Sequence, residues 1–262
     1  MKIAFYGCGN MVQALFPLGL KKFDFKVFAF TPTGIRASEF VAPFNGSVIL
    51  EDQINEGNFD VVVLGFKPQQ LNEFKVSHFH KKTLIISLLA GTTIEKIQKR
   101  FNCLNVIRLM PNTPSKLGEG VTLIAQSESV NDEQSLFWKS FFSTVGTVFN
   151  CESEHQLDQL TPVTGSGPAY LFEWARIFFN YVKELGLNDK DAKDLVSKLF
   201  LGSSKMLSED SDDFETLRNK VTSKKGVTYE ALEEFKKSNL EQLTKNALDR
   251  AYERVLELGE ES

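Results

Sequence analysis

The stretch that decides the fold is Ile3-Ala-Phe-Tyr-Gly-Cys-Gly-Asn-Met-Val12. Its first four residues are apolar or aromatic without alternation, as in a strand buried on both faces of a parallel sheet. A helical pattern over residues 10–22 follows the two glycines. Glycines at such a junction allow a tight turn and let backbone N–H groups approach a pyrophosphate. The stretch therefore predicts a dinucleotide-binding βαβ unit, with an ordinary glycine turn as the alternative because Val12 replaces the third glycine of the usual fingerprint.

The alternation of strands and helices continues along the first part of the chain. Further strands are expected at residues 25–30, 60–66, 84–89, 105–110, 121–125 and 146–151, and helices at residues 93–101 and 133–143. Such alternation is typical of βαβ units and a parallel sheet. After residue 155 the strand signals stop, and a 3.6-residue period indicates helices over residues 168–185, 191–207 and 240–258. We therefore predict the α/β fold class, with an N-terminal Rossmann-like dinucleotide-binding domain over residues 1–155 and an all-helical domain over residues 156–262.

Composition narrows the class of protein. The 262 residues include 34 Asp or Glu and 30 Lys or Arg, a formal net charge of -4, which argues against a nucleic-acid partner or an anionic membrane surface. An apolar content of 42% and a charged content of 24% exclude wholesale disorder. The three cysteines are widely spaced, and His78 and His80 are interpreted as solvated loop residues, so no disulfide framework and no metal site is expected. Since no run approaches the roughly 18 apolar residues of a membrane span and no signal-peptide core is apparent, we expect a cytoplasmic protein.

The end of the second predicted strand bears on the choice of cofactor. The sequence there is Ala29-Phe-Thr-Pro-Thr-Gly-Ile-Arg36. NAD enzymes place an acid at this point to bind the ribose 2′-hydroxyl, but this stretch contains no Asp or Glu. The hydroxyls of Thr31 and Thr33 and the guanidinium of Arg36 suit a 2′-phosphate instead. We therefore predict NADPH as the cofactor, with NADH as the alternative; the competing interpretation is a solvated turn with an incidental arginine.

Three further loops carry polar or glycine-rich sequence. Gly65-Phe-Lys-Pro68 ends an apolar run, where the ligands of open α/β sheets collect, although a Lys-Pro pair is also an ordinary strand end. Thr164-Gly-Ser-Gly-Pro-Ala-Tyr170 precedes a predicted helix, and its N–H groups either hold a carboxylate or belong to a simple capped helix. Val221-Thr-Ser-Lys-Lys-Gly-Val-Thr228 has the same two interpretations, an anion-binding turn that presents the Thr228 hydroxyl or a capped loop. Cys8 lies in the first glycine turn, so alkylation of its thiol is expected to block cofactor binding.

Taken in order, these motifs resemble those of the pyrroline-5-carboxylate reductase family, over essentially the whole chain. The matching segments are Gly7-Cys-Gly-Asn-Met11, Asp60-Val-Val-Val-Leu-Gly-Phe-Lys-Pro-Gln69, Ala90-Gly-Thr-Thr-Ile94, Met110-Pro-Asn-Thr-Pro114, Gly165-Ser-Gly-Pro-Ala-Tyr170, Leu217-Arg-Asn-Lys-Val-Thr-Ser223 and Ala251-Tyr-Glu-Arg254. The segment that begins at Gly165 is the most family-specific. The resemblance implies that the helical domain dimerises by interleaving with its partner, that five such dimers form a decameric ring, and that the active site lies between the cofactor domain and the helical dimer.

The resemblance also implies a reaction and a set of site residues. The reaction is the last step of proline biosynthesis, in which NAD(P)H delivers a hydride to the C=N carbon of 1-pyrroline-5-carboxylate. Thr228 is implied as the catalytic hydrogen-bond donor to the imine nitrogen, and the N–H groups of Gly226, Val227 and Thr228 as the ligands of the substrate carboxylate. The residues implied to contact the dinucleotide, in addition to Arg36, are Tyr6, Gly7, Cys8, Gly9, Asn10, Met11, Thr31, Gly65, Phe66, Lys67, Pro68, Leu89, Ala90 and Gly91.

The chain departs from the family pattern in the implied substrate loop. The family usually has Pro-Gly where this chain has Lys224-Lys225. If the loop needs a positive φ at residue 225, lysine strains it by about 1 kcal/mol. Asn219 replaces a common acidic residue, and Asp52 stands where an asparagine often contacts the cofactor ribose. These departures leave two alternatives open: a related reductase that acts on another imine or keto acid, and a non-catalytic paralogue that binds the nucleotide.

Overall fold

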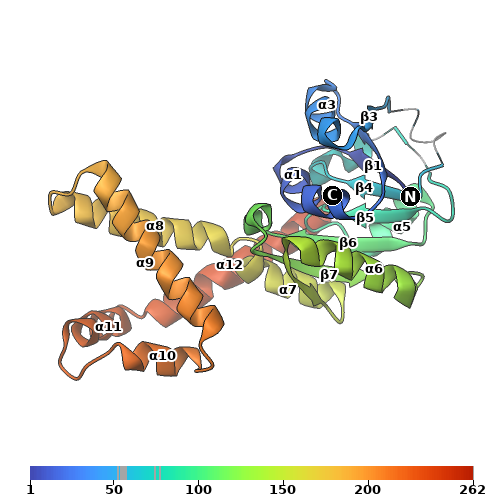
Figure 1. The fold of residues 1–262 in the computed structure, drawn as a ribbon. Helices are drawn as coiled ribbons and strands as arrows, with labels where there is room; N and C mark the ends of the chain where they lie inside the picture. Colours follow the sequence, from blue (N-terminus) through green and yellow to red (C-terminus); the bar gives the residue numbers. More distant parts are fainter. Residues whose placement is uncertain (52, 54–57, 74, 77, 262) are drawn as a thin grey trace. The chain divides into compact units, whose positions relative to one another are not determined.

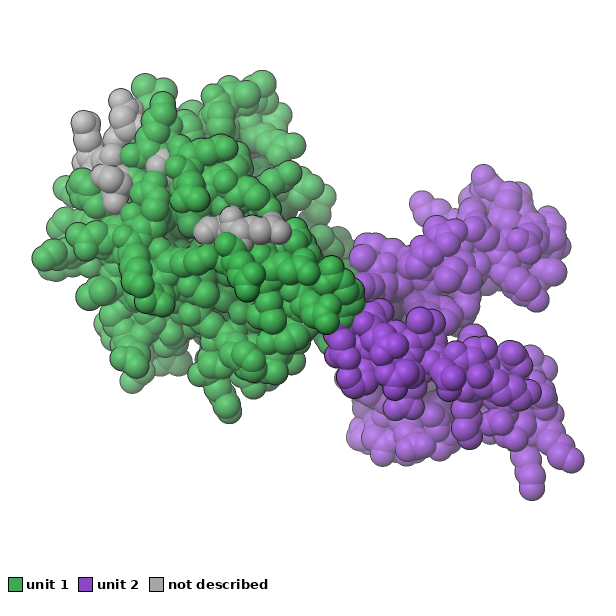
Figure 2. Space-filling view, turned by 180° about the vertical axis from the view of Figure 1, so that it is seen from behind, with its two compact units in different colours: residues 1–168, 250–262 green, residues 169–249 purple. Residues whose placement is uncertain are grey.

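The computed structural model describes residues 1–51, 53, 58–73, 75–76 and 78–261. Asp52, which the family resemblance places near the ribose, therefore lies outside the described residues. The chain forms two compact units, which Figure 2 shows in different colours. Unit 1 comprises Met1–Pro168 and Arg250–Ser262, and unit 2 comprises Ala169–Asp249.

Unit 1 is built on one eight-stranded sheet (Figure 1). Its strands are β1 (Lys2–Tyr6), β2 (Lys26–Phe30), β3 (Ser47–Val48), β4 (Val61–Leu64), β5 (Leu84–Ser87), β6 (Val106–Pro111), β7 (Gly120–Gln126) and β8 (Gly146–Asn150). Their order is β3-β2-β1-β4-β5-β6-β7-β8, and all neighbours are parallel except β6 and β7. The first six strands have the order of a dinucleotide-binding fold, so the predicted α/β class with a Rossmann-like N-terminal domain is confirmed.

The sheet lies between two apolar cores. Alternate residues of β1 enter different cores, with Ile3 and Phe5 in the first and Ala4 and Tyr6 in the second. β4 is buried at every position, as expected for an unbroken apolar run in a parallel sheet. The first core is rich in aromatic rings, and Phe16 meets Phe5 edge to face with centroids 4.8 Å apart. Burial on both faces of the sheet therefore explains why apolar residues do not alternate with polar ones along strands such as β1 and β4.

The helices of unit 1 include the predicted segments, one of them divided in two, together with α3 (Ile35–Val41) and α7 (Glu154–Thr164), which the sequence does not predict. The others are α1 (Asn10–Leu15), α2 (Pro17–Lys22), α5 (Ile94–Phe101) and α6 (Asp132–Phe142), with 3-10 turns η1 (Ala42–Phe44), η2 (Pro68–Glu73), η3 (Thr113–Leu117) and η4 (Ser143–Val145). The single helix predicted over residues 10–22 is wrong, because Pro17 has no N–H with which to continue it. The sequence does not predict β3, because this strand has only 2 residues and both are exposed.

Unit 1 extends beyond the domain boundary predicted at residue 155. Helix α7 belongs to it because Leu157 is buried in the second core and because Arg108 of β6 pairs with Glu154 and Asp158 of α7. Unit 1 therefore runs to Pro168, and it also includes the last turns of α12 (Leu240–Glu261). The predicted ranges 1–155 and 156–262 differ from these units because the strand pattern in the sequence ends at residue 155, whereas the helix that follows still packs against the sheet of unit 1.

Unit 2 is all helical, as predicted for this part of the chain. It contains α8 (Gly167–Glu184) from Ala169 onward, α9 (Asp189–Glu209), α10 (Phe214–Lys220), α11 (Val227–Lys237) and the first part of α12. Several large apolar side chains are at least half exposed in the single chain, among them Phe172, Tyr181 and Leu201. Exposed apolar surface of this kind is typical of a protein–protein interface. None of the helices in the described ranges combines the length and apolar character needed to span a membrane.

Candidate active site

Two glycine turns meet at the carboxyl end of the sheet. Gly7, directly after β1, has a φ of 88°, and a Cβ placed on it would lie 2.8 Å from the carbonyl carbon of Gly65, directly after β4. A Cβ on Gly65 would in turn lie 2.4 Å from Cγ2 of Val12. Both positions therefore require glycine. Val12, which replaces the third glycine of the fingerprint, fits because Gly65 has no side chain.

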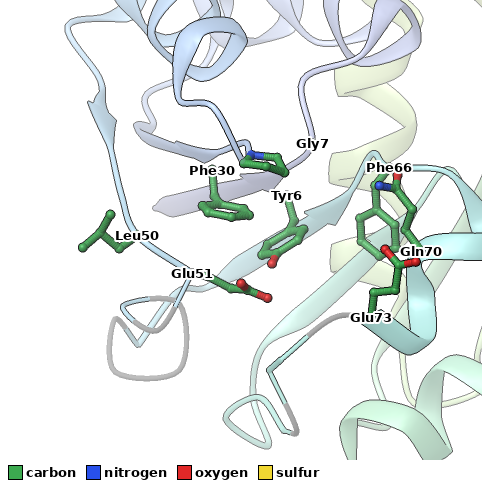
Figure 3. A pocket seen from close by; sticks show the side chains of 9 residues that line it. Tyr6, Gly7, Phe30, Leu50, Glu51, Phe66, Gln70 and Glu73 are labelled. Carbon is green, nitrogen blue, oxygen red and sulfur yellow. The ribbon is translucent and has the colours of Figure 1, made fainter.

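A cavity of about 460 Å³ opens beside these turns (Figure 3). Three aromatic rings line it, those of Tyr6 at the end of β1, Phe30 at the end of β2 and Phe66 just after β4. The ring centroid of Tyr6 lies 4.7 Å from that of Phe30 and 5.5 Å from that of Phe66. Aromatic walls at the carboxyl ends of parallel strands suit a planar heteroaromatic ring, such as the base of a dinucleotide.

Glu51 gives this cavity a negatively charged edge. The hydroxyl of Tyr6 donates a hydrogen bond to the Glu51 carboxylate, and the backbone N–H of Lys75 donates to Glu51 Oε1 over 2.9 Å. Burial, together with the hydrogen bond and charge of Glu51, raises the pKa of Tyr6 well above its ordinary value. The phenol therefore remains a donor at neutral pH. Sequence reasoning missed Glu51, because it lies in no motif and follows a strand too short to detect.

The residues predicted to bind a 2′-phosphate lie at the end of β2. Gly34 has a φ of 71° and precedes α3, whose first turn carries the exposed Arg36. Thr33 is exposed as well, whereas Thr31 is 9% exposed, and its Oγ1 accepts the N–H of Ala37 over 3.3 Å. Thr31 therefore holds the start of α3 in place, and Thr33 and Arg36 are the side chains accessible to a ligand.

The other predicted dinucleotide contacts lie at the same edge of the sheet. Residues 9–11, 65–68 and 89–91 follow β1, β4 and β5, which are adjacent strands. The structure thus brings the predicted cofactor residues of unit 1 together. The predicted substrate residues, from Gly226 to Thr228, belong to unit 2.

The predicted substrate loop of unit 2 ends at the start of α11. Gly226 is the N-cap of this helix, and its N–H donates to the carbonyl of Ser223 over 2.9 Å. This N–H is used within the loop, and its implied role as a carboxylate ligand stays a prediction. The first N–H groups of an α-helix have no acceptor within the helix, so those of Val227 and Thr228 remain for an anion. Both residues are exposed in the single chain.

Lys225 has the strained conformation that the departure from the family pattern predicts. Its φ is 57°, in the left-handed region that favours glycine. We expect Lys225→Gly to raise the free energy of unfolding by about 1 kcal/mol, because the left-handed strain of a side chain is removed. Urea unfolding followed by circular dichroism measures this.

The matched control for Lys225 is its neighbour. Lys224 does not have a positive φ, so Lys224→Gly is expected to lower the free energy of unfolding by about 0.5–1 kcal/mol through backbone entropy alone. If the two glycine variants have the same stability, the strain at residue 225 is absent.

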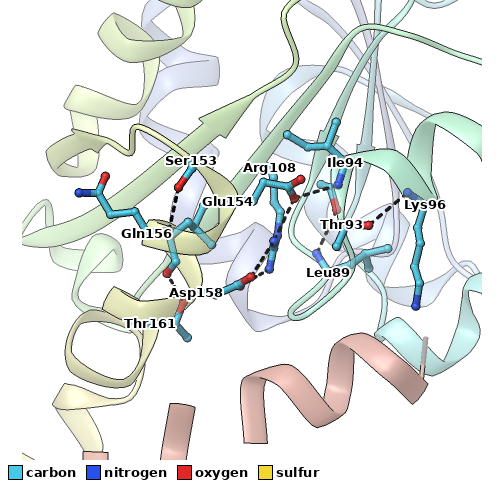
Figure 4. A network of polar contacts seen from close by, with 12 residues as sticks. Leu89, Thr93, Ile94, Lys96, Arg108, Ser153, Glu154, Gln156, Asp158 and Thr161 are labelled. Carbon is cyan, nitrogen blue, oxygen red and sulfur yellow. Dashed lines mark hydrogen bonds and ion pairs between the residues drawn. The ribbon is translucent and has the colours of Figure 1, made fainter. Parts of the chain in front are cut away.

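A buried polar network fixes the loop after β5 and the start of α7 (Figure 4). Arg108 of β6 is 2% exposed. Its Nη1 lies 3.0 Å from Oε1 of Glu154, and its Nη2 lies 2.5 Å from Oδ1 of Asp158. Glu154 Oε1 also accepts the N–H of Ile94, the first residue of α5, over 2.8 Å. Sequence reasoning missed this network, because an arginine in an apolar run gives no sign of the acids that will face it.

His78 and His80, the histidines of the predicted loop, are exposed. Nδ1 of His80 accepts the backbone N–H of Lys82 over 3.3 Å. Within the part of the chain that the structure describes, no group of three or more His, Cys, Asp or Glu side chains is placed to hold a metal ion.

Cys8 does not present its thiol to the cofactor site. The residue is 1% exposed and belongs to the first apolar core. Burial raises the pKa of this thiol to about 12. Since the thiolate is the reactive form, the expectation that alkylation of Cys8 blocks cofactor binding is corrected for the folded protein.

We expect iodoacetamide to modify Cys151, which is only partly buried, well before Cys8. With a pKa of about 12, roughly one Cys8 thiol in 10⁴ is ionised at pH 8, and this fraction rises about tenfold per pH unit. Mass spectrometry of peptides after timed labelling between pH 7 and 9 measures both rates. Labelling in urea is the control, where burial no longer separates the cysteines; faster labelling of Cys8 than of Cys151 in the folded protein contradicts the argument.

Both units have counterparts among known proteins. Residues 154–258 match the family model described as pyrroline-5-carboxylate reductase dimerisation. The chain is 30% identical over 270 residues to a pyrroline-5-carboxylate reductase of Staphylococcus aureus (strain COL), with 99% of this chain and 98% of the relative covered. A pyrroline-5-carboxylate reductase structure from Coxiella burnetii is similar at 30% identity and a TM-score of 0.83, over 98% of this chain and 97% of the other. Pyrroline carboxylate reductase of Plasmodium falciparum, solved with NADP bound, has the same fold at 24% identity and a TM-score of 0.84, over 99% and 98% of the two chains.

These similarities cover nearly the whole chain and therefore both units. In unit 1, the first six strands of the sheet and the glycine turns at Gly7 and Gly65 have the arrangement of a dinucleotide-binding fold. In unit 2, the helices lie within the residues that match the dimerisation model. The chain therefore belongs to the pyrroline-5-carboxylate reductase family.

Proposed function

We propose that the protein reduces 1-pyrroline-5-carboxylate to L-proline with NAD(P)H, the last step of proline biosynthesis. The observation that carries the proposal is the 30% identity to a pyrroline-5-carboxylate reductase across 99% of this chain. The cavity and glycine turns of unit 1 support the cofactor part of the proposal, because they lie where open α/β sheets bind dinucleotides. The exposed start of α11 supports the substrate part, because a helix N-terminus binds carboxylates.

In this reaction the residues of unit 2 activate and orient the imine. The bound nicotinamide supplies the hydride that adds to the C=N carbon. The hydroxyl of Thr228 donates a hydrogen bond to the imine nitrogen, which makes the neighbouring carbon more electrophilic. The N–H groups of Val227 and Thr228 hold the substrate carboxylate at the start of α11. Together these contacts restrict the positions that the reacting carbon can take.

The test is the decay of NADPH absorbance with purified protein and 1-pyrroline-5-carboxylate, with NADH run in parallel. We expect saturable decay at an ordinary enzymatic rate of about 1–10³ s⁻¹. The same mixture without the imine is the control. Tight NADPH binding without turnover on any imine would contradict the proposal and favour a non-catalytic nucleotide-binding protein.

One observation favours a second candidate, a related reductase that acts on a more acidic imine or keto acid. Lys224 and Lys225 are both exposed in the loop that precedes α11, and their ammonium groups add positive charge beside the proposed carboxylate site. A panel of cyclic imines and 2-keto acids with one or two carboxylates separates the candidates. A higher kcat/KM for a dicarboxylate would favour the second.

We propose NADPH as the preferred cofactor, since Thr33 and Arg36 are accessible at the end of β2 and the Plasmodium falciparum relative was solved with NADP bound. Arg36→Ala is expected to raise KM for NADPH about tenfold, because a charged hydrogen bond to the 2′-phosphate is lost. The KM for NADH is the internal control and should stay unchanged. An equal rise for both cofactors would contradict the assignment of Arg36 to the 2′-phosphate.

The proposed assembly is a homodimer through unit 2, extended to a decamer of five dimers. The match of residues 154–258 to the family's dimerisation model supports the dimer, and the exposed apolar side chains of unit 2 agree with it. Sedimentation equilibrium measures the assembly, and a monomer at micromolar concentration would contradict both states. The cytoplasm remains our prediction for the location of the reaction.

A further inference from the structure

The end of α12 lies directly on the loop that follows β5. Gly91 in this loop has a φ of 73°, and a Cβ placed on it would lie 2.6 Å from the backbone nitrogen of Gly259 and 2.9 Å from the carbonyl carbon of Leu258. A Cβ on Gly259 would lie 2.8 Å from the carbonyl oxygen of Gly91. The two backbones therefore touch, and each glycine makes room for the other. All of these residues belong to unit 1.

A second contact ties the same turn of α12 to α5. The ammonium group of Lys96, in the first turn of α5, donates a hydrogen bond to the carbonyl oxygen of Gly259. Carbonyl groups in the last turn of a helix lack intrahelical partners, and a cation there is favourable. Because α5 begins immediately after the loop, this bond and the glycine contact hold the loop from two directions. Leu89, within the loop, is 1% exposed, so the loop has little freedom to move independently.

The loop after β5 lies on the nicotinamide side of the dinucleotide edge. A dinucleotide-binding sheet consists of two mononucleotide-binding halves that meet at β1 and β4. The aromatic cavity lies on the half that contains β1 and β2 and therefore suits the adenosine part. β5 lies on the other side of β4, so the loop that follows it faces the position of the nicotinamide part.

We propose that Gly259 and Lys96 are positioning residues for the nicotinamide half of the cofactor, because they fix the loop over residues 89–91. This inference rests on the proposed function only in assuming a nicotinamide dinucleotide. It assigns a role to the last turn of α12 that is separate from dimerisation. The adenosine half binds independently of this turn.

The test compares the whole cofactor with its adenosine half. Gly259→Ala places a methyl group against the carbonyl of Gly91, so we expect the dissociation constant of NADPH to rise about tenfold, which corresponds to about 1.4 kcal/mol. The dissociation constant of 2′,5′-ADP, which lacks the nicotinamide part, should stay within a factor of about two. Fluorescence titration measures the first, and competition or calorimetry measures the second.

Two matched controls isolate the contact. Glu260→Ala changes the exposed neighbour of Gly259 and is expected to leave both constants unchanged. Gly91→Ala and Gly118→Ala impose the same strain, at φ values of 73° and 80°, but only Gly91 has neighbours within 4 Å. Gly91→Ala should therefore weaken NADPH binding, whereas Gly118→Ala should not.

Lys96→Met keeps the inference testable if Gly259→Ala unfolds, since it removes the ammonium group that donates to α12 without changing either glycine. We expect about a threefold rise in the dissociation constant of NADPH and no change for 2′,5′-ADP. Equal weakening of both ligands, or unchanged NADPH binding in both Gly259→Ala and Lys96→Met, would overturn the inference. Because these titrations need no imine, an enzyme that binds NADPH selectively but reduces no 1-pyrroline-5-carboxylate would refute the proposed function and leave this inference standing.

Discussion

Thr228→Ala is expected to lower kcat for 1-pyrroline-5-carboxylate reduction by about 10²–10³-fold, the effect of removing one positioned donor from a transition state. As the hydride adds to the C=N carbon, electron density builds up on the imine nitrogen. The hydrogen bond from the Thr228 hydroxyl stabilises it until the nitrogen takes up a proton from solvent. This side chain is exposed at the start of α11, so its removal should leave the packing of unit 2 intact. Stopped-flow or steady-state absorbance of NADPH measures the rate.

Two comparisons decide whether Thr228 acts chemically. Thr228→Ser retains the hydroxyl and should keep kcat within about tenfold of the original protein. The dissociation constant of NADPH should be the same in both variants, because the cofactor residues belong to unit 1. An alanine variant with unchanged kcat, or one whose loss is explained by weaker NADPH binding, would remove Thr228 from the mechanism.

Arg108→Met is expected to lower the free energy of unfolding of unit 1 by about 3–5 kcal/mol, as is usual when one partner of a buried ion pair is removed. The guanidinium is 2% exposed and neutralises both Glu154 and Asp158. Without it the two carboxylates face each other at a partly buried site without the guanidinium that pairs with both. Urea unfolding at fixed protein concentration measures the change, since assembly also contributes to stability.

Two variants serve as controls for Arg108→Met: one removes an exposed ion pair, and the other removes the charges of Glu154 and Asp158 together with that of Arg108. Arg176 pairs with Glu173 over 2.6 Å on the surface of α8, and Arg176→Met should have little effect because exposed pairs contribute little. Arg108→Met combined with Glu154→Gln and Asp158→Asn should recover part of the lost stability, since no unpaired charge is left. If Arg108→Met is as mild as Arg176→Met, the network is not a determinant of stability.

Much of unit 1 could be predicted because burial on both faces leaves a clear pattern. β4 and β5 are buried at every position; β4 coincides with an unbroken apolar run in the sequence, and β5 with a run in which Ser87 is the polar residue. What escaped prediction depends on packing between distant segments. Helix α7 joins unit 1 through Arg108 and Leu157, and no local pattern shows that a helix after the last strand packs back onto the sheet.

In the candidate site, too, some features could be predicted from the sequence and others could not. The glycine turn at Gly7 is predictable, because its conformation and its surroundings both demand glycine. The strain at Lys225 also follows from the sequence once a glycine is expected there. Glu51 and the contact between Gly91 and Gly259 could not be predicted, because each joins segments whose proximity only the folded chain establishes.

Unit 2 interrupts unit 1, because the chain leaves unit 1 after Pro168 and returns to it at Arg250. This arrangement sets an order of events during synthesis. The eight strands that the structure describes leave the ribosome before unit 2 is complete, but the turn that contacts Gly91 is made only after unit 2. Domains fold as units as the chain emerges, so we expect the sheet to form early and the loop after β5 to gain its contact with α12 only after unit 2 has been made. Nascent chains halted before residue 250 should therefore hold a formed sheet whose nicotinamide side is unfinished.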